Sequence, residues 1–205
     1  MQIRHLISEG EHQQQDFKYA VTSVSKIAHS LSAFANTDGG RLLIGVRDNG
    51  TLAGVKSEEE IYMIDAAASQ CRPEVECQME VVREEGKQIV IATISPAGKR
   101  PVKCREEDGT YRAYLRQLDE NIVASPLHLE LWRQLESPGQ LTLTDSEHHL
   151  LQLISHEGTT LNRFCRQSGL KRQRAIRLLA GWIRFDLLRL VYREPKWMIE
   201  LNNDD

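Results

Sequence analysis

The first part of the chain alternates between segments with helical hydrophobic spacing and shorter, nearly continuous apolar segments. Apolar residues recur at helical spacing across Val24–Ala35, which predicts an amphipathic helix with one face in a core. Gly39 and Gly40 follow, and glycine readily takes the positive φ that ends a helix. The apolar run Leu42–Val46 then predicts a short, largely buried strand. This order of helix, glycine pair and strand is the most informative feature of the sequence.

The rest of the first 124 residues extends this pattern into an α+β domain. The tetrapeptide Asp48–Thr51 predicts a two-residue hairpin turn into strand Thr51–Val55, because Asn-Gly suits the backbone of a type I′ turn. Apolar and alternating segments between turn residues predict further strands of a mixed sheet with packed helices. The expected helices are Ile3–Ser8 and Ser57–Cys71, and the expected strands are Gln14–Tyr19, Glu76–Arg83, Gln88–Ser95, Val102–Arg105 and Thr110–Arg116.

From Leu141 onward the pattern changes to three helices and a hairpin. Thr144 and Glu147 form a capping box at the start of the first helix. Helices Thr160–Gln167 and Lys171–Phe185 follow, and then a pair of strands over 187–201, which is the outline of a small winged helix-turn-helix domain. We therefore expect an α+β domain over 1–124, a connector with a short helix over 125–140, and a winged-helix-like domain over 141–205.

Composition narrows the class of protein. The 205 residues carry a net charge of −3, which argues neither for nor against a nucleic-acid partner. No apolar run reaches the length of a membrane span, and the N-terminus lacks the apolar stretch of a secretory signal, so we expect a cytoplasmic protein without a membrane partner. The four cysteines form no C-x-x-C pair, which indicates free thiols and no zinc site.

Cations gather on the third predicted helix of the C-terminal domain. Its apolar side chains cluster on one side of a helical wheel and its basic side chains on the other. Phosphate contacts need such a surface, although a solvated basic face without a partner is the open alternative. The expected nucleic-acid contacts are Lys171, Arg172, Gln173, Arg174, Arg177, Arg184, Arg193 and Lys196, with a second basic rim at Arg100, Lys103, Arg112 and Arg116.

Carboxylates flank two of the predicted strands. Glu11 precedes the first strand, strand alternation puts Asp16 and Lys18 on one face, and Asp48 follows the strand after the glycine pair. If these strands are neighbours, the three acids converge as ligands for Mg²⁺ or Mn²⁺, which would position a water against a phosphodiester. Lys18 would then stabilise the developing negative charge. The alternative is that these acids are solvated or structural.

The run AFANTDGGRLLIGVRDNGTLAGV, residues 33–55, resembles the Schlafen AlbA-type domain, also described as an AlbA-like DNA-binding domain. Upstream, GEHQQQDFK is similar to the Gly-Glu-Ser and Glu-Phe-Lys pattern of that family, with His12 in place of Ser and Asp16 in place of Glu. The resemblance covers roughly the first 120 residues. Some Schlafen proteins are endoribonucleases acting on tRNA and rRNA, so the resemblance implies a catalytic, metal-binding trio of Glu11, Asp16 and Asp48, with Lys18 beside it.

These observations lead to one hypothesis and two alternatives. The sequence favours a bacterial nucleic-acid-binding protein that acts on DNA or RNA, as a DNA-binding regulator or a defence-associated factor. A Mg²⁺- or Mn²⁺-dependent endoribonuclease that cleaves structured RNA such as tRNA is the first alternative, and a protein-interaction module is the second. No P-loop motif occurs, so we expect no ATP. The resemblance also implies a homodimer as a candidate assembly.

Overall fold

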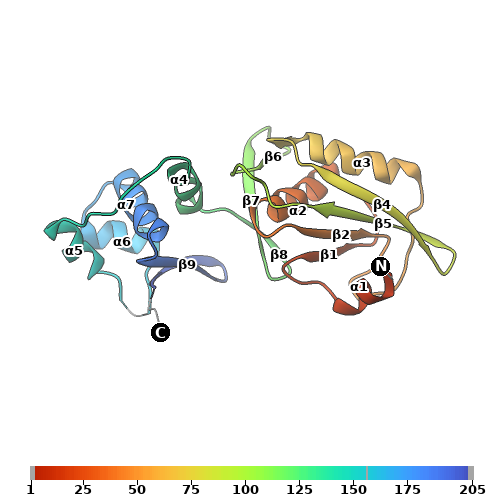
Figure 1. The fold of residues 1–205 in the computed structure, drawn as a ribbon. Helices are drawn as coiled ribbons and strands as arrows, with labels where there is room; N and C mark the ends of the chain where they lie inside the picture. The colour runs from red at the N-terminus through yellow and green to blue at the C-terminus, as the bar shows by residue number, and fades with distance from the viewer. Residues whose placement is uncertain (1–2, 156, 203–205) are drawn as a thin grey trace. The chain divides into compact units, whose positions relative to one another are not determined.

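The computed structural model describes residues 3–155 and 157–202, which form two compact units that divide between Val123 and Ala124. Figure 1 shows both, and we describe unit 1 and unit 2 separately. Unit 1 contains α1 (Ile3–Glu9), β1 (Gln15–Lys18), α2 (Val24–Asn36), β2 (Gly40–Ile44), α3 (Glu58–Ser69), β3 (Cys71–Arg72), β4 (Cys77–Glu84), β5 (Lys87–Ile94), β6 (Lys103–Arg105), β7 (Tyr111–Gln117) and β8 (Glu120–Val123). Unit 2 contains α4 (Pro126–Leu135), α5 (Asp145–Leu151), α6 (Leu161–Ser168), α7 (Arg172–Arg184), β9 (Leu188–Arg193) and β10 (Lys196–Leu201). No helix within the described ranges has the length and apolar character needed to cross a membrane.

Two four-stranded sheets contact α2 in unit 1. The first has the strand order β1-β2-β5-β4, with β1 and β2 parallel and the other neighbours antiparallel. The second is antiparallel, with the order β3-β6-β7-β8. Helix α2 touches both sheets and α3, which explains why nearly all of its last three turns are buried. The expected α+β class with a mixed sheet is confirmed, and the second sheet is an addition to it.

Strand β2 is buried on both faces. Leu42 and Ile44 belong to the core around α2, whereas Leu43 packs with Ile3 and Leu6 of α1. Successive side chains of a strand point to opposite faces, so one apolar run serves two clusters. This explains why the sequence shows a continuous apolar segment here instead of an alternating one.

The two glycines between α2 and β2 have different roles. Gly39 has a φ of +70°, a conformation that glycine adopts without steric cost. At Gly40 an added Cβ would lie 2.5 Å from the ring of Phe34 and 2.7 Å from the carbonyl oxygen of Gln14. Gly39 therefore supplies the backbone conformation of the turn, and Gly40 lets β2 begin in close contact with α2.

The loop after β2 differs from the two-residue turn that we expected. Gly50 N donates to Arg47 O at 2.7 Å and Arg47 N donates to Thr51 O at 3.0 Å, so three residues separate the paired positions. Gly50 has a positive φ but Asn49 does not, whereas a type I′ turn requires both. Residues 51–55 form one isolated bridge and not the expected strand.

Unit 2 has the expected order of three helices and an antiparallel hairpin, preceded by α4. Gly169, with a φ of +66°, ends α6 in the left-handed conformation, and α7 begins three residues later. Helix α4 packs against α7, so the segment that we expected as a connector supplies a helix to the core of unit 2. The winged-helix assignment stays a prediction. The buried core residues are Leu127, Ile154, Phe164, Ala175, Leu179, Trp182, Leu188 and Ile199.

Candidate nucleic-acid interface and acidic site

Strand β1 brings Glu11 and Asp16 together beside Lys18. Phe17 N donates to Glu11 Oε1 at 2.9 Å, which holds this carboxylate against the strand. Asp16 Oδ2 lies 2.8 Å from Lys18 Nζ. Phe17 points to the opposite face, into the cluster around α1, as strand alternation predicts. Three of the four residues expected to be catalytic therefore lie at one place.

The carboxylate of Asp16 is buried and held by several donors. Its exposed fraction is 2%. Ser30 Oγ donates to Oδ2 at 3.3 Å, and Arg116 Nη2 approaches Oδ1 at 3.5 Å. A buried carboxylate needs partners of this kind, because an unpaired charge away from water is costly. Asp16 therefore has a structural role in the core of unit 1.

Glu11 sits close enough to Asp16 for the two carboxyl groups to affect each other. Burial raises the pKa of the Glu11 carboxyl, and the adjacent Asp16 raises it further. The hydrogen bond from Phe17 N and the charge of Lys18 act in the opposite direction. Two neighbouring carboxylates favour either a shared proton or a bound cation, since both relieve their repulsion.

Asp48 lies apart from this pair, in the exposed loop after β2. The register pairs Asp16 with Leu42 and Lys18 with Ile44, so β2 has passed the acidic pair before the chain reaches Asp48. Within residues 3–155 and 157–202, its carboxylate takes part in no hydrogen bond or ion pair. The structure therefore brings two of the three expected acids together and leaves the third separate.

Arg116 is buried, and the expectation that it lies on an exposed basic rim is wrong. Only 2% of the residue is exposed. Its Nη2 donates to Gln15 O at 3.0 Å and its Nη1 donates to Asn121 Oδ1 at 3.1 Å. The guanidinium also lies 5.3 Å from the ring centre of Phe34. Arg116 thus joins β7 to β1 and α2 and is not available to a ligand at the surface.

The other members of the expected rim do not share a face. Arg100 Nη2 donates at 2.6 Å to the carbonyl oxygen of Thr37, the residue that caps the C-terminus of α2. In the β6–β7 pair, Lys103 lies opposite Ala113 and Arg112 opposite Cys104. Directly paired residues point to the same side of a sheet, so Lys103 and Arg112 point to opposite sides. The expectation that these basic residues of unit 1 form one surface is therefore wrong.

The start of α7 presents a different picture. Lys171, Arg172, Gln173 and Arg174 are all exposed, and Arg177 is exposed one turn later. The opposite side of α7 is apolar and enters the core of unit 2. Exposed cations of α6 and β10 lie beside this helix. Arg172 lines one cavity with the cations of α6 and β10, whereas Arg174 and Arg177 line another together with Glu147, so the cations of α7 lie on more than one side of the helix. We call the following set the α7 basic surface: Arg166, Lys171, Arg172, Gln173, Arg174, Arg177 and Lys196.

A cavity of about 400 Å³ opens beside the α7 basic surface, within unit 2. The first residues of α4 and α6 line it, together with Arg166, Arg172, Lys196 and Trp197. Arg172 Nη1 donates to Asn162 Oδ1 at 2.6 Å on its rim. Cations and helix N-termini both favour an anion. No pattern in the sequence indicated this cavity, because its residues come from separated segments.

Two other residues that we expected to contact nucleic acid bind other groups of the protein instead. Arg184 donates to the carbonyl oxygen of Gln134, in the last turn of α4, and to that of Ser137, just after the helix. Arg193 forms an ion pair with Glu200 of β10. Cations at a helix C-terminus stabilise the helix, so Arg184 serves α4 and not an external ligand.

The family comparison matches unit 1 and almost none of unit 2. A family model described as Schlafen, AlbA_2 matches residues 11–125. No curated protein matches the chain. The crystal structure of the DIP2311 protein from Corynebacterium diphtheriae matches with a TM-score of 0.49 and 14% identity, over 91% of this chain and 34% of that one, so this chain spans about a third of its length.

A second solved structure is the N-terminal domain of an ATP-dependent DNA helicase RecG-related protein from Nitrosomonas europaea, determined by solution NMR. It matches with a TM-score of 0.41 and 19% identity, over 69% of this chain and 94% of that domain. The family match spans more than half of the chain and includes the acidic pair, α2, the glycine pair and β2. The chain therefore belongs to the Schlafen AlbA_2 family.

Proposed function

We propose that the protein binds nucleic acid through the α7 basic surface and acts as a DNA-binding regulator or a defence-associated factor. The observation that carries this proposal is the first turn of α7, where Lys171, Arg172, Gln173 and Arg174 are all exposed. Release of counterions from phosphates supplies much of the affinity of such a surface for nucleic acid. The order of three helices and a hairpin in unit 2 supports the prediction of a winged helix-turn-helix, a motif whose second helix enters the major groove.

The residues of this surface suit two kinds of contact. The side chains at the start of α7 are of the types that reach base edges or phosphates in a major groove. Arg166 and Lys196 line the neighbouring cavity with Arg172, where a phosphate would meet three cations. We infer that phosphates position the nucleic acid there and that the start of α7 reads it.

A charge-reversal experiment tests this proposal. The pair Arg174→Glu and Arg177→Glu is compared with the wild type by fluorescence anisotropy on duplex DNA over a series of salt concentrations. The wild type should bind with a marked salt dependence, and the double variant should lose affinity, with the slope of log K against log salt shallower by about 2.

The matched control is the pair Lys56→Glu and Arg83→Glu, which makes the same change in net charge at exposed positions of unit 1. It should bind duplex DNA like the wild type. Equal affinity for the α7 double variant and this control would refute the proposed interface.

The second candidate function is a metal-dependent endoribonuclease. The adjacency of Glu11 and Asp16 beside Lys18 favours it, because such a pair suits Mg²⁺ or Mn²⁺. The test incubates total tRNA with the protein, with and without Mn²⁺. Glu11→Gln tests the metal site more cleanly than Asp16→Asn, since Asp16 also pairs with the buried Arg116. Cleavage that needs Mn²⁺ and is lost in Glu11→Gln, but kept in the exposed control Glu58→Gln, would support it.

A further inference from the structure

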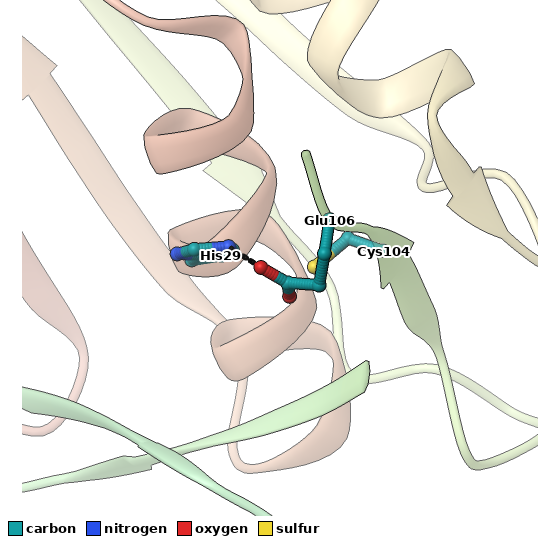
Figure 2. A group of neighbouring side chains, drawn as sticks. All are labelled: His29, Cys104 and Glu106. Carbon is teal, nitrogen blue, oxygen red and sulfur yellow. Dashed lines mark hydrogen bonds and ion pairs between the residues drawn. The ribbon is translucent and has the colours of Figure 1, made fainter. Parts of the chain in front are cut away.

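We propose that His29, Cys104 and Glu106 form a zinc site in unit 1, separate from the acidic pair and from the α7 basic surface. The three side chains come from α2 and from the β6 strand and the residue after it, and Figure 2 shows them converging. Their candidate ligand atoms all lie within 4.8 Å of one another. His29 Nε2 is 3.2 Å from Glu106 Oε2.

The ligand types and the geometry suit zinc. Zinc accepts thiolate, imidazole and carboxylate ligands in a tetrahedral arrangement, whereas Mg²⁺ prefers oxygen ligands alone. Tetrahedral zinc bonds place neighbouring ligand atoms about 3.3–3.8 Å apart, so the cluster closes around the ion with small side-chain movements. The expectation of no zinc site considered only cysteine spacing, and this cluster combines Cys104 and Glu106 with His29, which lies more than seventy positions earlier in the chain.

The surroundings hold two of the ligands in place. The ring of His29 stacks on the ring of Tyr114, with centroids 4.2 Å apart and planes at 24°. Tyr114 Oη donates to Glu106 Oε1 at 3.0 Å, which leaves Oε2 directed at His29. Hydrogen bonds from neighbouring groups to metal ligands are the usual means of orienting them.

The fourth coordination position would open to a cavity. A cavity of about 360 Å³ is lined by His29 and Glu106, together with Ser25, Lys26 and Arg112. Three protein ligands with one open position, filled by water, is the arrangement of reactive zinc sites and not of closed structural ones. The cations Lys26 and Arg112 line this cavity together with the acids Glu107 and Asp108, so its charged side chains are of both signs.

Zinc binding here exchanges a proton for the metal. Binding forms the Cys104 sulfur–zinc bond as the thiol proton is released to solvent, because the thiolate is the form of cysteine that ligates zinc.

The test measures metal on the full-length protein. Zinc-loaded wild type is passed over gel filtration and its zinc content is determined by mass spectrometry. One zinc per chain is expected in the wild type and in Cys165→Ser, which removes a thiol of unit 2 outside the cluster. Cys104→Ser and His29→Gln should retain none. Tyr114→Phe should keep the ligands but weaken zinc binding by about 10–100-fold in a chelator competition.

A spectroscopic measurement removes the dependence on any one variant. Cobalt(II) substituted into the wild type should show the near-ultraviolet charge-transfer band of a cobalt–thiolate bond, and Cys165→Ser should show the same band. Wild type without retained zinc, or cobalt without this band, would overturn the proposal. Zinc content unchanged in both ligand variants would overturn it as well. None of these results bears on DNA binding by unit 2.

Discussion

Asn36 links α2 to β7 and to Val102, the residue directly before β6. Its amide nitrogen donates to Val102 O at 2.7 Å and to Tyr114 O at 2.9 Å. Its Oδ1 accepts from Val102 N at 2.8 Å. Asn36 is only 1% exposed, so water cannot reach these backbone groups to take the place of its side chain. A single side chain thus satisfies three backbone groups in the core.

We therefore predict that Asn36→Ala lowers the free energy of unfolding of unit 1 by about 2–4 kcal/mol, because it leaves buried polar groups unpaired. Urea unfolding followed by far-ultraviolet circular dichroism measures the change. The control Gln78→Ala, at an exposed position of β4, should differ from the wild type by less than about 0.5 kcal/mol. A loss for Asn36→Ala as small as that of the control would contradict this account.

Residue roles could be predicted where they depend on local alternation. The shared face of Asp16 and Lys18 follows from strand geometry and is found. The burial of Arg116 could not be foreseen, because its partners Gln15 and Asp16 lie about a hundred positions earlier in the chain. Only the β1–β2 register shows that Asp48 lies beyond the acidic pair.

Helices and long strands were predictable because their periodicity is long enough to read. Helix α2, β4 and β5 lie within two residues of their expected bounds, and Glu85 and Gly86 form the turn between the two strands with positive φ. Strands β3 and β8 contain two and four residues, too few for a pattern. The expected strand 51–55 fails where Gly54 adopts a φ of +80°.

At the start of α4, the hydrogen bond between Ser125 and His128 requires a neutral imidazole ring. Ser125 N donates to His128 Nδ1 at 3.2 Å, and Ser125 Oγ lies 2.8 Å from the same nitrogen. The ring also packs edge-on against Trp197, with centroids 4.4 Å apart. Burial lowers the pKa of His128 to about 4. A protonated ring would lose the bond from Ser125 N, which agrees with this direction.

This lowered pKa predicts a loss of stability in mild acid. The unfolded chain binds a proton on His128 near pH 6.5 and the folded unit only near pH 4, so stability falls as the pH drops between these values. The contribution of His128 to this loss is about 3 kcal/mol. Urea unfolding at pH 7 and pH 4.5 should show a smaller difference for His128→Gln than for the wild type. The exposed control His148→Gln should keep the full difference, and an equal difference in both variants would refute the assignment.

The molecule combines a family domain with a unit outside the family match. The match ends at residue 125, within two residues of the division between the units. The acidic pair and the proposed zinc site lie in unit 1, whereas the α7 basic surface lies in unit 2. Each unit also has its own buried core. Binding of nucleic acid and any metal chemistry are therefore assigned to different parts of the chain and can be removed separately.

Separate cores predict that the two units unfold as separate transitions. All three tryptophans, at positions 132, 182 and 197, lie in unit 2, so tryptophan fluorescence follows that unit alone, while circular dichroism follows both. Asn36→Ala should move the transition seen by circular dichroism and leave the fluorescence midpoint where it is in the wild type. His128→Gln should move the fluorescence midpoint and only the part of the circular dichroism transition that belongs to unit 2, since its effect falls on α4. A shift of the fluorescence midpoint in Asn36→Ala that coincides with the shift in circular dichroism would mean that the units unfold as one cooperative body, because two-state behaviour makes all probes agree.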